Sequence, residues 1–254
     1  MRKPDVYRIG KVPVSVTSAE AVAEKVLSTI ASGGKGYVCV SNMRTVVAAN
    51  KDKAYLEVME KSLLNTPDGT PLVWCGRAWG LKDVRRVVGL DVFTALLPSA
   101  ARHYFLGDTE ETLEALTRKV EEEGRDVAGS YSPPFAPLES YDLPGIADRI
   151  NKSGATLVWV SLRAPKQDFL AAALLPYLNN GIVLIGVGAV FRIYLGEYKL
   201  DRGPLQKMGL GGLKMIRNSS VWKEIKWYFT HACYLLYFLT GILIKRIKGE
   251  SPDN

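Results

Sequence analysis

Short apolar runs alternate with longer amphipathic stretches along most of the chain. The apolar runs are bounded by glycine or polar residues, as β-strands are, and lie at 37–41, 103–107, 126–131, 156–162 and 182–188. The amphipathic stretches predict helices at 17–34, 108–124, 143–154 and 164–181. From residue 103 onward the strand starts recur roughly every 25 residues, with a helix between each pair. This rhythm predicts an α/β fold built on a largely parallel sheet.

The first predicted helix carries its own start and stop signals. Thr17 stands three residues before Glu20, which is the spacing of a capping box, and the pattern ends at Gly33 and Gly34. We therefore expect Thr17 to cap this helix.

Polar or glycine-containing turns follow several of the predicted strands. Ser41 and Asn42 stand at the end of the first, Gly107 at the end of the second, the segment 163–168 after the fourth, and Gly188 at the end of the last. Ligands of parallel sheets bind at the carboxyl ends of the strands. We therefore expect these turns to line one common cleft.

The character of the chain changes near its C-terminus. Residues 227–244 contain no acid, lysine or arginine and are flanked by Lys223, Lys226, Lys245, Arg246 and Lys248. At 1.5 Å per residue this segment barely reaches across a hydrocarbon layer of about 30 Å. Its aromatic residues and His231 favour a helix that lies in, or dips into, the cytoplasmic leaflet. A buried C-terminal helix and an oligomer contact are the alternatives.

The charge distribution supports a division of the chain at this point. Residues 1–191 hold 22 Lys and Arg against 21 Asp and Glu, whereas residues 192–254 hold 11 against 5. A basic tail fits an anionic partner, either nucleic acid or the cytoplasmic face of a membrane. We therefore expect a catalytic domain over 1–200 and a basic, apolar appendage over 201–254.

The remaining composition indicates an ordinary intracellular protein. With 254 residues, 47% of them hydrophobic, the chain can bury a full core. Its three cysteines form no C-x-x-C pair, so neither a disulfide framework nor a zinc site is indicated. The N-terminus has no apolar segment behind its positive charges and does not match a secretory signal.

Three short motifs have both a structural and a functional interpretation. Asp68, in Pro-Asp-Gly, is either a turn residue or a general base held at the end of an element. Arg86 belongs either to an exposed cationic face or to a phosphate contact. Lys166 and Gln167 lie in an ordinary strand-to-helix junction, whose amides and side chains also suit an anion or a sugar.

Several common signatures are absent from the sequence. There is no G-x-x-x-x-G-K-[ST], no D-x-D, and no complete dinucleotide fingerprint, since "GVGAVF" lacks the third glycine. His103 and His231 stand in apolar contexts. These observations argue against P-loop chemistry, an acidic metal clamp on a diphosphate, and a nicotinamide oxidoreductase.

Six segments of the chain resemble, in order, the motifs of the WecG/TagA/CpsF glycosyltransferases. They are "SNMRTVVAA", "NTPDGTPLVW", "RRVVGLDVF", "YFLGDTEETLEAL", "LVWVSLRAPKQDFL" and "IGVGAVFRIYLGEYKLDRGPLQKMGL". The resemblance covers roughly residues 10–215. It implies a Rossmann-like fold with helices on both faces of the sheet. It also implies an inverting, membrane-associated enzyme that transfers an N-acetylmannosamine-type sugar from a UDP donor to a polyprenyl-diphosphate-linked GlcNAc in envelope polysaccharide synthesis.

The same resemblance implies the partners of the chain. These are the UDP-sugar, the lipid-linked acceptor and the cytoplasmic side of the cell membrane, reached through the C-terminal segment. It implies no obligatory metal, no cofactor and no nucleic acid, and it leaves homo-oligomerisation open.

The resemblance also assigns roles to individual residues. It makes Asp68 the base and puts Arg86 and Gln167 near the donor diphosphate or sugar, together with Asn42. Ser41, Lys166, Gly107 and Gly188 are the further substrate-binding candidates. The sequence departs from the family pattern at Val40, where a threonine is usual, at Asp168, where glutamate is commoner, and at "GLGG" (209–212), where the family has "GLEW".

These departures give weight to a different class of function. A non-catalytic, membrane-bound protein that binds nucleotide sugars or acts as a scaffold would keep the fold while losing parts of the site. An oxidoreductase on the same kind of sheet is a second alternative, against which the missing glycine fingerprint counts.

Overall fold

The computed structural model describes residues 5–198 and 221–253. The start of the predicted appendage, with its "GLGG" departure, lies outside the described residues, as do the side chains of 221–231.

In the described part of the chain, eight strands form two sheets. The strands are β1 (Val6–Ile9), β2 (Val12–Ser15), β3 (Gly36–Ser41), β4 (Leu64–Pro67), β5 (His103–Gly107), β6 (Val127–Tyr131), β7 (Leu157–Ser161) and β8 (Val183–Gly186). β1 and β2 pair as an antiparallel hairpin, and the other six form a sheet in the order β4-β3-β8-β7-β5-β6. Every pairing within the six-stranded sheet is parallel. The predicted parallel sheet and its five predicted strands are therefore confirmed.

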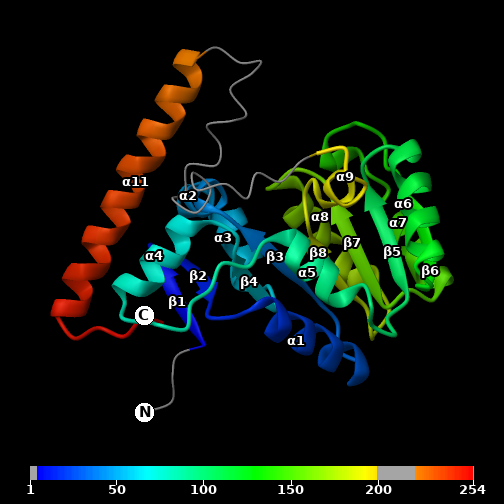
Figure 1. Cartoon of the computed structure of the whole chain (residues 1–254), viewed down its shortest axis with the longest axis horizontal. Coiled ribbons are helices and arrows are strands. Elements are labelled where there is room, and N and C mark those ends of the chain that lie inside the picture. Colours follow the sequence, from blue (N-terminus) through cyan, green and yellow to red (C-terminus); the bar gives the residue numbers. More distant parts are fainter. Residues whose placement is uncertain (1–4, 199–220, 254) are drawn as a thin grey trace.

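The helices connect the strands and cover the sheet (Figure 1). They are α1 (Ala19–Ala31), α2 (Met43–Lys51), α3 (Lys53–Glu60), α4 (Thr70–Ala78), α5 (Gly89–Leu96), α6 (Glu110–Glu122), α7 (Leu143–Ser153), α8 (Lys166–Leu174), α9 (Val190–Tyr194) and α11 (Val221–Ile247), with short 3-10 turns at Leu138–Ser140 and Leu175–Tyr177.

Alternate side chains of the central strands pack into two separate hydrophobic cores. On β3, Val38 and Val40 pack into the cluster that contains residues of α1, α5, α6 and α9. Tyr37 and Cys39 point to the other side and pack with residues of α7 and α8. Since successive side chains of a strand face opposite sides of a sheet, helices cover both faces. The predicted Rossmann-like arrangement is confirmed.

Sequence analysis missed β4 and the hairpin. β4 reads Leu-Asn-Thr-Pro, which has neither an apolar run nor an alternating pattern, and it lies at the edge of the sheet, where a terminal proline costs no ladder bond. Asn65 and Thr66 are nevertheless buried, and Asn65 donates to the carbonyl oxygen of Pro13 over 2.6 Å. A contact with the hairpin, and not local preference, holds this strand.

Thr17 does not cap the first helix, which corrects the prediction. The N-cap is Ser18, whose hydroxyl accepts a hydrogen bond from the amide of Ala21. Thr17 is buried and its hydroxyl lies 3.3 Å from the carbonyl oxygen of Ser18, to which it donates. Two adjacent hydroxyl residues fit a cap equally well by composition, and the burial of Thr17 decides between them.

A third core joins the hairpin to α2, α3, α4 and α11. Phe238 and Ile242 of α11 are buried in it, and Arg246 donates to the carbonyl oxygen of Ala78 over 3.0 Å. Figure 1 shows α11 as a long helix beside α4 and the hairpin. In the described part of the chain, no helix is both long and apolar enough to cross a membrane.

The outer side of α11 is apolar as well. Its exposed large hydrophobic side chains are Leu236, Tyr237, Leu243, Ile244 and Ile247. The helix is thus packed on one side and offers an apolar surface on the other. A buried C-terminal helix and a helix that contacts a membrane were predicted as alternatives, and this packing is compatible with both.

We predict that Gly10→Ala destabilises the protein more than Gly33→Ala. Both glycines have left-handed φ values, +64° and +70°, but a Cβ at Gly10 would lie 2.1 Å from Oδ1 of Asn50, whereas one at Gly33 would meet nothing within 4 Å. The left-handed strain costs each variant roughly 1–2 kcal/mol. Gly10→Ala should lose about 1 kcal/mol more through the displaced hydrogen bond between Asn50 and Lys11.

Urea unfolding followed by circular dichroism measures the difference between the two variants. Equal free energies of unfolding would show that the contact between the hairpin turn and Asn50 is not a constraint on the fold.

Candidate active site

The predicted residues Asp68 and Ser41 meet at the carboxyl edge of the sheet. Pro67 is paired with Ser41 at the end of β4 and β3, and the amide of Asp68 donates to the carbonyl oxygen of Ser41 over 2.7 Å. Gly69, the next residue, lies close to Asn42, since a Cβ at Gly69 would be 3.7 Å from Cβ of Asn42. The loops after β3 and β4 therefore form one surface.

Arg86 reaches the same surface from the segment before α5. Its Nε donates to the carbonyl oxygen of Asp68 over 3.1 Å, and the amide of Val87 donates to the carbonyl oxygen of Pro67 over 2.9 Å. The chain after α4 thus returns to hold the Asp68 turn from outside. Asp68 and Arg86, 18 residues apart, become neighbours.

The Asp68 carboxyl has the electrostatics of a base that works near neutral pH. The residue is partly exposed. Burial of the carboxyl raises its pKa from 3.8 to about 7, an increase that Arg86 opposes and Asp91 supports. A carboxyl that is half ionised near pH 7 accepts protons far better than an ordinary aspartate does.

Asn42 and Ser41 fill different roles at this edge. Asn42 caps α2, and its Oδ1 accepts from the amides of Arg44 and Thr45 over 3.0 and 3.3 Å. Its Nδ2 is a donor that capping does not use. The Ser41 hydroxyl is buried and has no hydrogen-bond partner among the described residues. Both side chains keep unused hydrogen-bonding capacity next to Asp68.

A second group of predicted residues gathers at the carboxyl ends of β5, β7 and β8 and at the start of α8. Oε1 of Gln167 accepts from the amide of Gly188 over 2.9 Å, and the hydroxyl of Ser161 donates to the carbonyl oxygen of Gly188 over 2.6 Å. Gly107 has φ +106° and lies so close to Ser161 that a Cβ would be 2.5 Å from its carbonyl oxygen. Gln167, Gly188 and Gly107 are therefore part of one packed edge.

Lys166 does not join either group. Its ammonium donates to the carbonyl oxygen of Ala136 and, over 2.7 Å, to the hydroxyl of Tyr141. It also lies 4.4 Å from the centroid of the Tyr141 ring. In this structure Lys166 fastens the segment after β6 to the start of α8.

Two further ionic groups at the edge were not singled out by the sequence. Asp108 follows Gly107 with a left-handed φ of 61°, and Arg192 of α9 donates to its carboxylate at 2.6 Å. The polar turn after β5 was visible in the sequence, but its partner lies 84 residues away. A left-handed non-glycine residue is a mark of a constrained site.

A buried hydrogen-bonded pair, Tyr55 and Asp168, lies next to Gln167. Asp168 is 1% exposed, and its Oδ2 accepts from the hydroxyl of Tyr55 over 2.6 Å. Burial raises the pKa of Asp168 to about 6, against the opposing hydrogen bond from Tyr55. An acid directly after Gln167 was the only sequence signal for this arrangement.

Together the edge offers a base, a cation and several amide and hydroxyl groups. Asp68 follows β4 and Gly188 follows β8, and these two strands are separated by one strand, β3, which puts the strands themselves about 10 Å apart at the usual spacing. No cluster of three metal-binding side chains occurs in residues 5–198 and 221–253. The arrangement suits a polar, elongated ligand.

A sequence model of the glycosyl transferase WecG/TagA/CpsF family matches residues 7–247. The chain belongs to this family. The sequence resemblance is thereby confirmed, and the match extends through the hairpin at one end and α11 at the other.

Two relatives of this WecG/TagA/CpsF chain are both named N-acetylglucosaminyldiphosphoundecaprenol N-acetyl-beta-D-mannosaminyltransferase. The one from Bacillus spizizenii is 26% identical over 169 residues, which cover 64% of this chain and 63% of that protein. The one from Bacillus subtilis is 25% identical over 190 residues, which cover 72% of each.

We predict that Tyr55→Phe destabilises this WecG/TagA/CpsF protein by about 1–3 kcal/mol, because it leaves a buried carboxyl without its donor. The loss should be larger at pH 8 than at pH 5. The pKa of Asp168 is raised to about 6, so the folded carboxyl is largely protonated at pH 5 and ionised at pH 8, and the missing bond is strongest to the ionised form.

Urea unfolding at the two pH values gives the comparison. Tyr104→Phe is the matched control, since Tyr104 is buried in the core that α8 also lines, whereas the hydroxyl bonded to Asp168 is that of Tyr55. A loss that does not depend on pH would mean that the hydroxyl does not act through the carboxyl.

Proposed function

We propose that the protein is an inverting glycosyltransferase that moves an N-acetylmannosamine-type sugar from a UDP donor to a polyprenyl-diphosphate-linked GlcNAc acceptor. Family membership supports the reaction class, and the printed names of the two relatives support the sugar and the acceptor. The observation that carries the chemistry is Asp68, whose carboxyl has a pKa of about 7 at the carboxyl edge of the sheet.

In the proposed reaction, the Asp68 carboxylate takes the proton from the acceptor hydroxyl as its oxygen attacks the anomeric carbon. The bond from that carbon to the diphosphate breaks on the opposite face, and UDP leaves with the bonding electrons. A single displacement of this kind converts an α-linked donor into a β-linked product, which agrees with the β-linkage in the names of the relatives.

The diphosphate gains negative charge as it leaves, and Arg86 is the proposed group that faces this charge. Its Nε is held by the Asp68 carbonyl, so the cation and the base are fixed relative to each other before substrate binds. Lys166 serves this role only if it exchanges its contacts with Ala136 and Tyr141 for the diphosphate.

The donor sugar and the nucleotide are proposed to lie along the rest of the edge. Gln167 and Gly188 form one side, Gly107 marks the far end, and Asn42 and Ser41 offer donors close to Asp68. Oε1 of Gln167 already accepts a hydrogen bond from the amide of Gly188, so its Nε2 is the atom proposed to reach the donor.

A lipid-linked acceptor confines the reaction to a bilayer surface, so we propose that α11 holds the enzyme at the cytoplasmic face of the membrane. Its outer side exposes Tyr237, Ile244 and Ile247, and Lys245, Arg246 and Lys248 stand at its C-terminal end. Apolar side chains next to basic ones are the combination that binds an anionic membrane surface.

We predict that Asp68→Asn lowers kcat about 100- to 10,000-fold while the Kd for UDP stays within a factor of a few, because the amide cannot accept the proton. UDP release from UDP-N-acetylmannosamine is measured with a short-chain prenyl diphosphate-GlcNAc acceptor. In the wild type, kcat/KM should rise with pH through about 7 and then level off, because the free base must be deprotonated.

Asp91→Asn is the matched control, since Asp91 raises the pKa of Asp68 from a distance. It should keep most of the activity and move the pH profile to lower values. Equal UDP release by wild type and Asp68→Asn would reduce Asp68 to a turn residue. If all three proteins, the wild type included, bind UDP but none of them releases it from the donor, the non-catalytic sugar-binding alternative would be favoured.

We predict that a spin label on Cys233 enters a less polar environment when the protein meets phosphatidylglycerol vesicles. Cys233 is exposed on α11, while Cys39 and Cys75 are buried, so the label goes to one position. Electron paramagnetic resonance compares how accessible the label is to oxygen and to a water-soluble relaxing agent. The ratio of the two accessibilities gives the depth of the label in the membrane. A label that stays fully in water, in protein that does not sediment with vesicles, would contradict the membrane location.

A further inference from the structure

Asp108 and Arg192 form an ion pair at the carboxyl edge of the sheet, and the reaction proposed above gives this pair no role. Asp108 follows β5, and Arg192 lies in α9, which follows β8. Nε of Arg192 donates to the two carboxylate oxygens of Asp108 over 3.0 and 3.1 Å, and Nη2 donates to Oδ1 over 2.6 Å. Two nitrogens of one guanidinium on one carboxylate make a strong, oriented contact. The pair therefore ties α9 to the turn after β5.

This ion pair is largely shielded from solvent. The side chain of Asp108 is 10% exposed and that of Arg192 is 29% exposed. The pair of Arg102 and Asp126, at the amino ends of β5 and β6, is more open, with side chains 46% and 56% exposed. Water and salt screen exposed pairs, which contribute little to structure. Of the two pairs, we expect the one at the carboxyl edge to constrain the segments that it joins.

The backbone of Asp108 is held in an unfavourable conformation. Its φ of 61° lies in the left-handed region, directly after Gly107 at φ +106°. A non-glycine residue keeps such a conformation only where the surrounding contacts enforce it. Here the amide of Asp108 donates to the carbonyl oxygen of Ser161 over 3.1 Å, and its carbonyl oxygen accepts from the hydroxyl of Ser132 over 2.7 Å. Both backbone polar groups and the carboxylate of Asp108 are thus engaged.

The contacts of Asp108 continue into a closed ring. Ser161, whose carbonyl oxygen accepts from Asp108, donates its own hydroxyl to the carbonyl oxygen of Gly188 over 2.6 Å. The chain then runs from Gly188 into α9, where Arg192 returns to Asp108. The ring joins the turns that follow β5, β7 and β8, and the ion pair is the link that closes it.

Gly188 connects this ring to a residue of the proposed donor site. Its amide donates to Oε1 of Gln167 over 2.9 Å, and Gln167 is buried. A shift of α9 would move Gly188 and change the hydrogen bond that orients the Gln167 side chain. The ion pair can therefore act on Gln167 without touching it.

We propose that Asp108 and Arg192 are positioning residues for the donor, because their ion pair closes the ring that holds Gly188 and Gln167 in the geometry that binds the nucleotide sugar. The inference rests on the proposed function, in which Gln167 contacts the donor. Arg192 also lies 3.3 Å from the carboxylate of Glu197, so two carboxylates already balance its charge. This balance favours a positioning role over a direct contact with the donor diphosphate.

The test compares variants of the full chain that break the pair. Asp108→Asn removes the charge but keeps a residue type that tolerates a left-handed φ, Arg192→Gln removes the cation, and a double variant carries both changes. Asp126→Asn is the matched control, since it removes the same charge from the exposed pair at the other end of β5.

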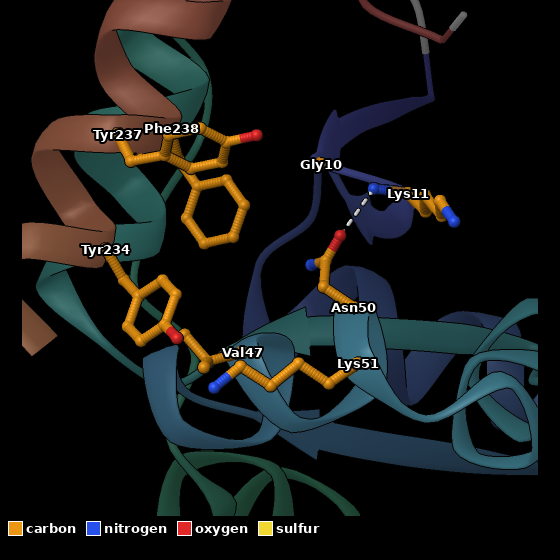
Figure 2. Close-up of a pocket in the computed structure, with 8 residues that line it drawn as sticks. All are labelled: Gly10, Lys11, Val47, Asn50, Lys51, Tyr234, Tyr237 and Phe238. Carbon is orange, nitrogen blue, oxygen red and sulfur yellow. Dashed lines mark hydrogen bonds between the residues drawn. The ribbon is translucent and has the colours of Figure 1, made fainter.

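Asn50→Ala is the control for lost stability. Asn50 lies near the C-terminal end of α2, and its Oδ1 accepts from the amide of Lys11 in the hairpin turn (Figure 2). Losing this bond should lower the melting temperature without disturbing the ring. Circular dichroism melting sets a temperature at which every variant is folded.

Titration calorimetry gives the Kd for UDP, and UDP release from UDP-N-acetylmannosamine with a short-chain prenyl diphosphate-GlcNAc gives the donor KM and kcat. We expect each single variant of the pair to raise the Kd and the donor KM about 10-fold, the scale of one charge-assisted hydrogen bond. The change in kcat should be much smaller, because binding is lost and not a contact made only in the transition state. The double variant should bind UDP as weakly as either single variant, since the same link is lost. Both controls should keep the wild-type donor KM.

Additive losses in the double variant would overturn the inference, because the two residues would then act separately. Tighter UDP binding by Asp108→Asn would do so as well, since the released Arg192 would then bind phosphate itself. Pair variants that melt at lower temperature but keep the wild-type Kd and KM would reduce the pair to a structural link. If the wild type binds no UDP, the proposed donor is wrong and the inference falls with it, whereas equal UDP binding by all variants leaves the donor in place and removes only the positioning role.

Discussion

Parallel pairing of the six strands is the constraint on which the rest of the molecule depends. Because β4, β3, β8, β7 and β5 all run in the same direction, their carboxyl ends lie along one edge, and the loops that follow them share that edge. Asp68, Asn42, Gly188, Gln167 and Gly107 are scattered over 147 positions of the chain, from residue 42 to residue 188. An antiparallel arrangement of the same strands would send half of them to the opposite end.

Backbone hydrogen bonds fix the position of Asp68 at this edge. Asp68 is fixed on one side by Ser41 through its amide and on the other by Arg86 through its carbonyl. Neither of these two bonds uses its carboxyl, and burial raises the pKa of that carboxyl to about 7. Pro-Asp-Gly forms the short junction between β4 and α4, and this junction holds the carboxyl at the edge of the sheet. The role of Asp68 as a base is the proposal made above.

The N-terminal hairpin and α11 extend this scaffold toward the proposed membrane surface. The hairpin packs under β4 and α4, and α11 packs on α4 and α2 through Phe238 and Ile242. α11 thus packs on the two helices that start at this edge, α2 after Asn42 and α4 after Asp68. In the proposed function, this packing would orient the edge toward a lipid-linked acceptor.

The sequence by itself determined the features that depend on local pattern and on short motifs. The five long apolar strands, the helices between them and the order of the family motifs are encoded by residues close together in the chain, so the fold class and the candidates Asp68, Arg86 and Gln167 could be named from it. The cap of α1 was assigned to Thr17 and lies at Ser18, because burial, which no local pattern contains, decides between neighbouring hydroxyls.

Only the tertiary structure decided the contacts between distant segments. β4 is a strand because Asn65 meets the hairpin, Lys166 turns to Tyr141 and not to the Asp68 group, and Asp168 is buried against Tyr55 from another helix. The two sides of α11 differ for the same reason, since an apolar helix does not specify which of its faces will find a partner. Hydrogen bonds and burial between remote residues depend on the packed chain as a whole, and that is the information a linear pattern lacks.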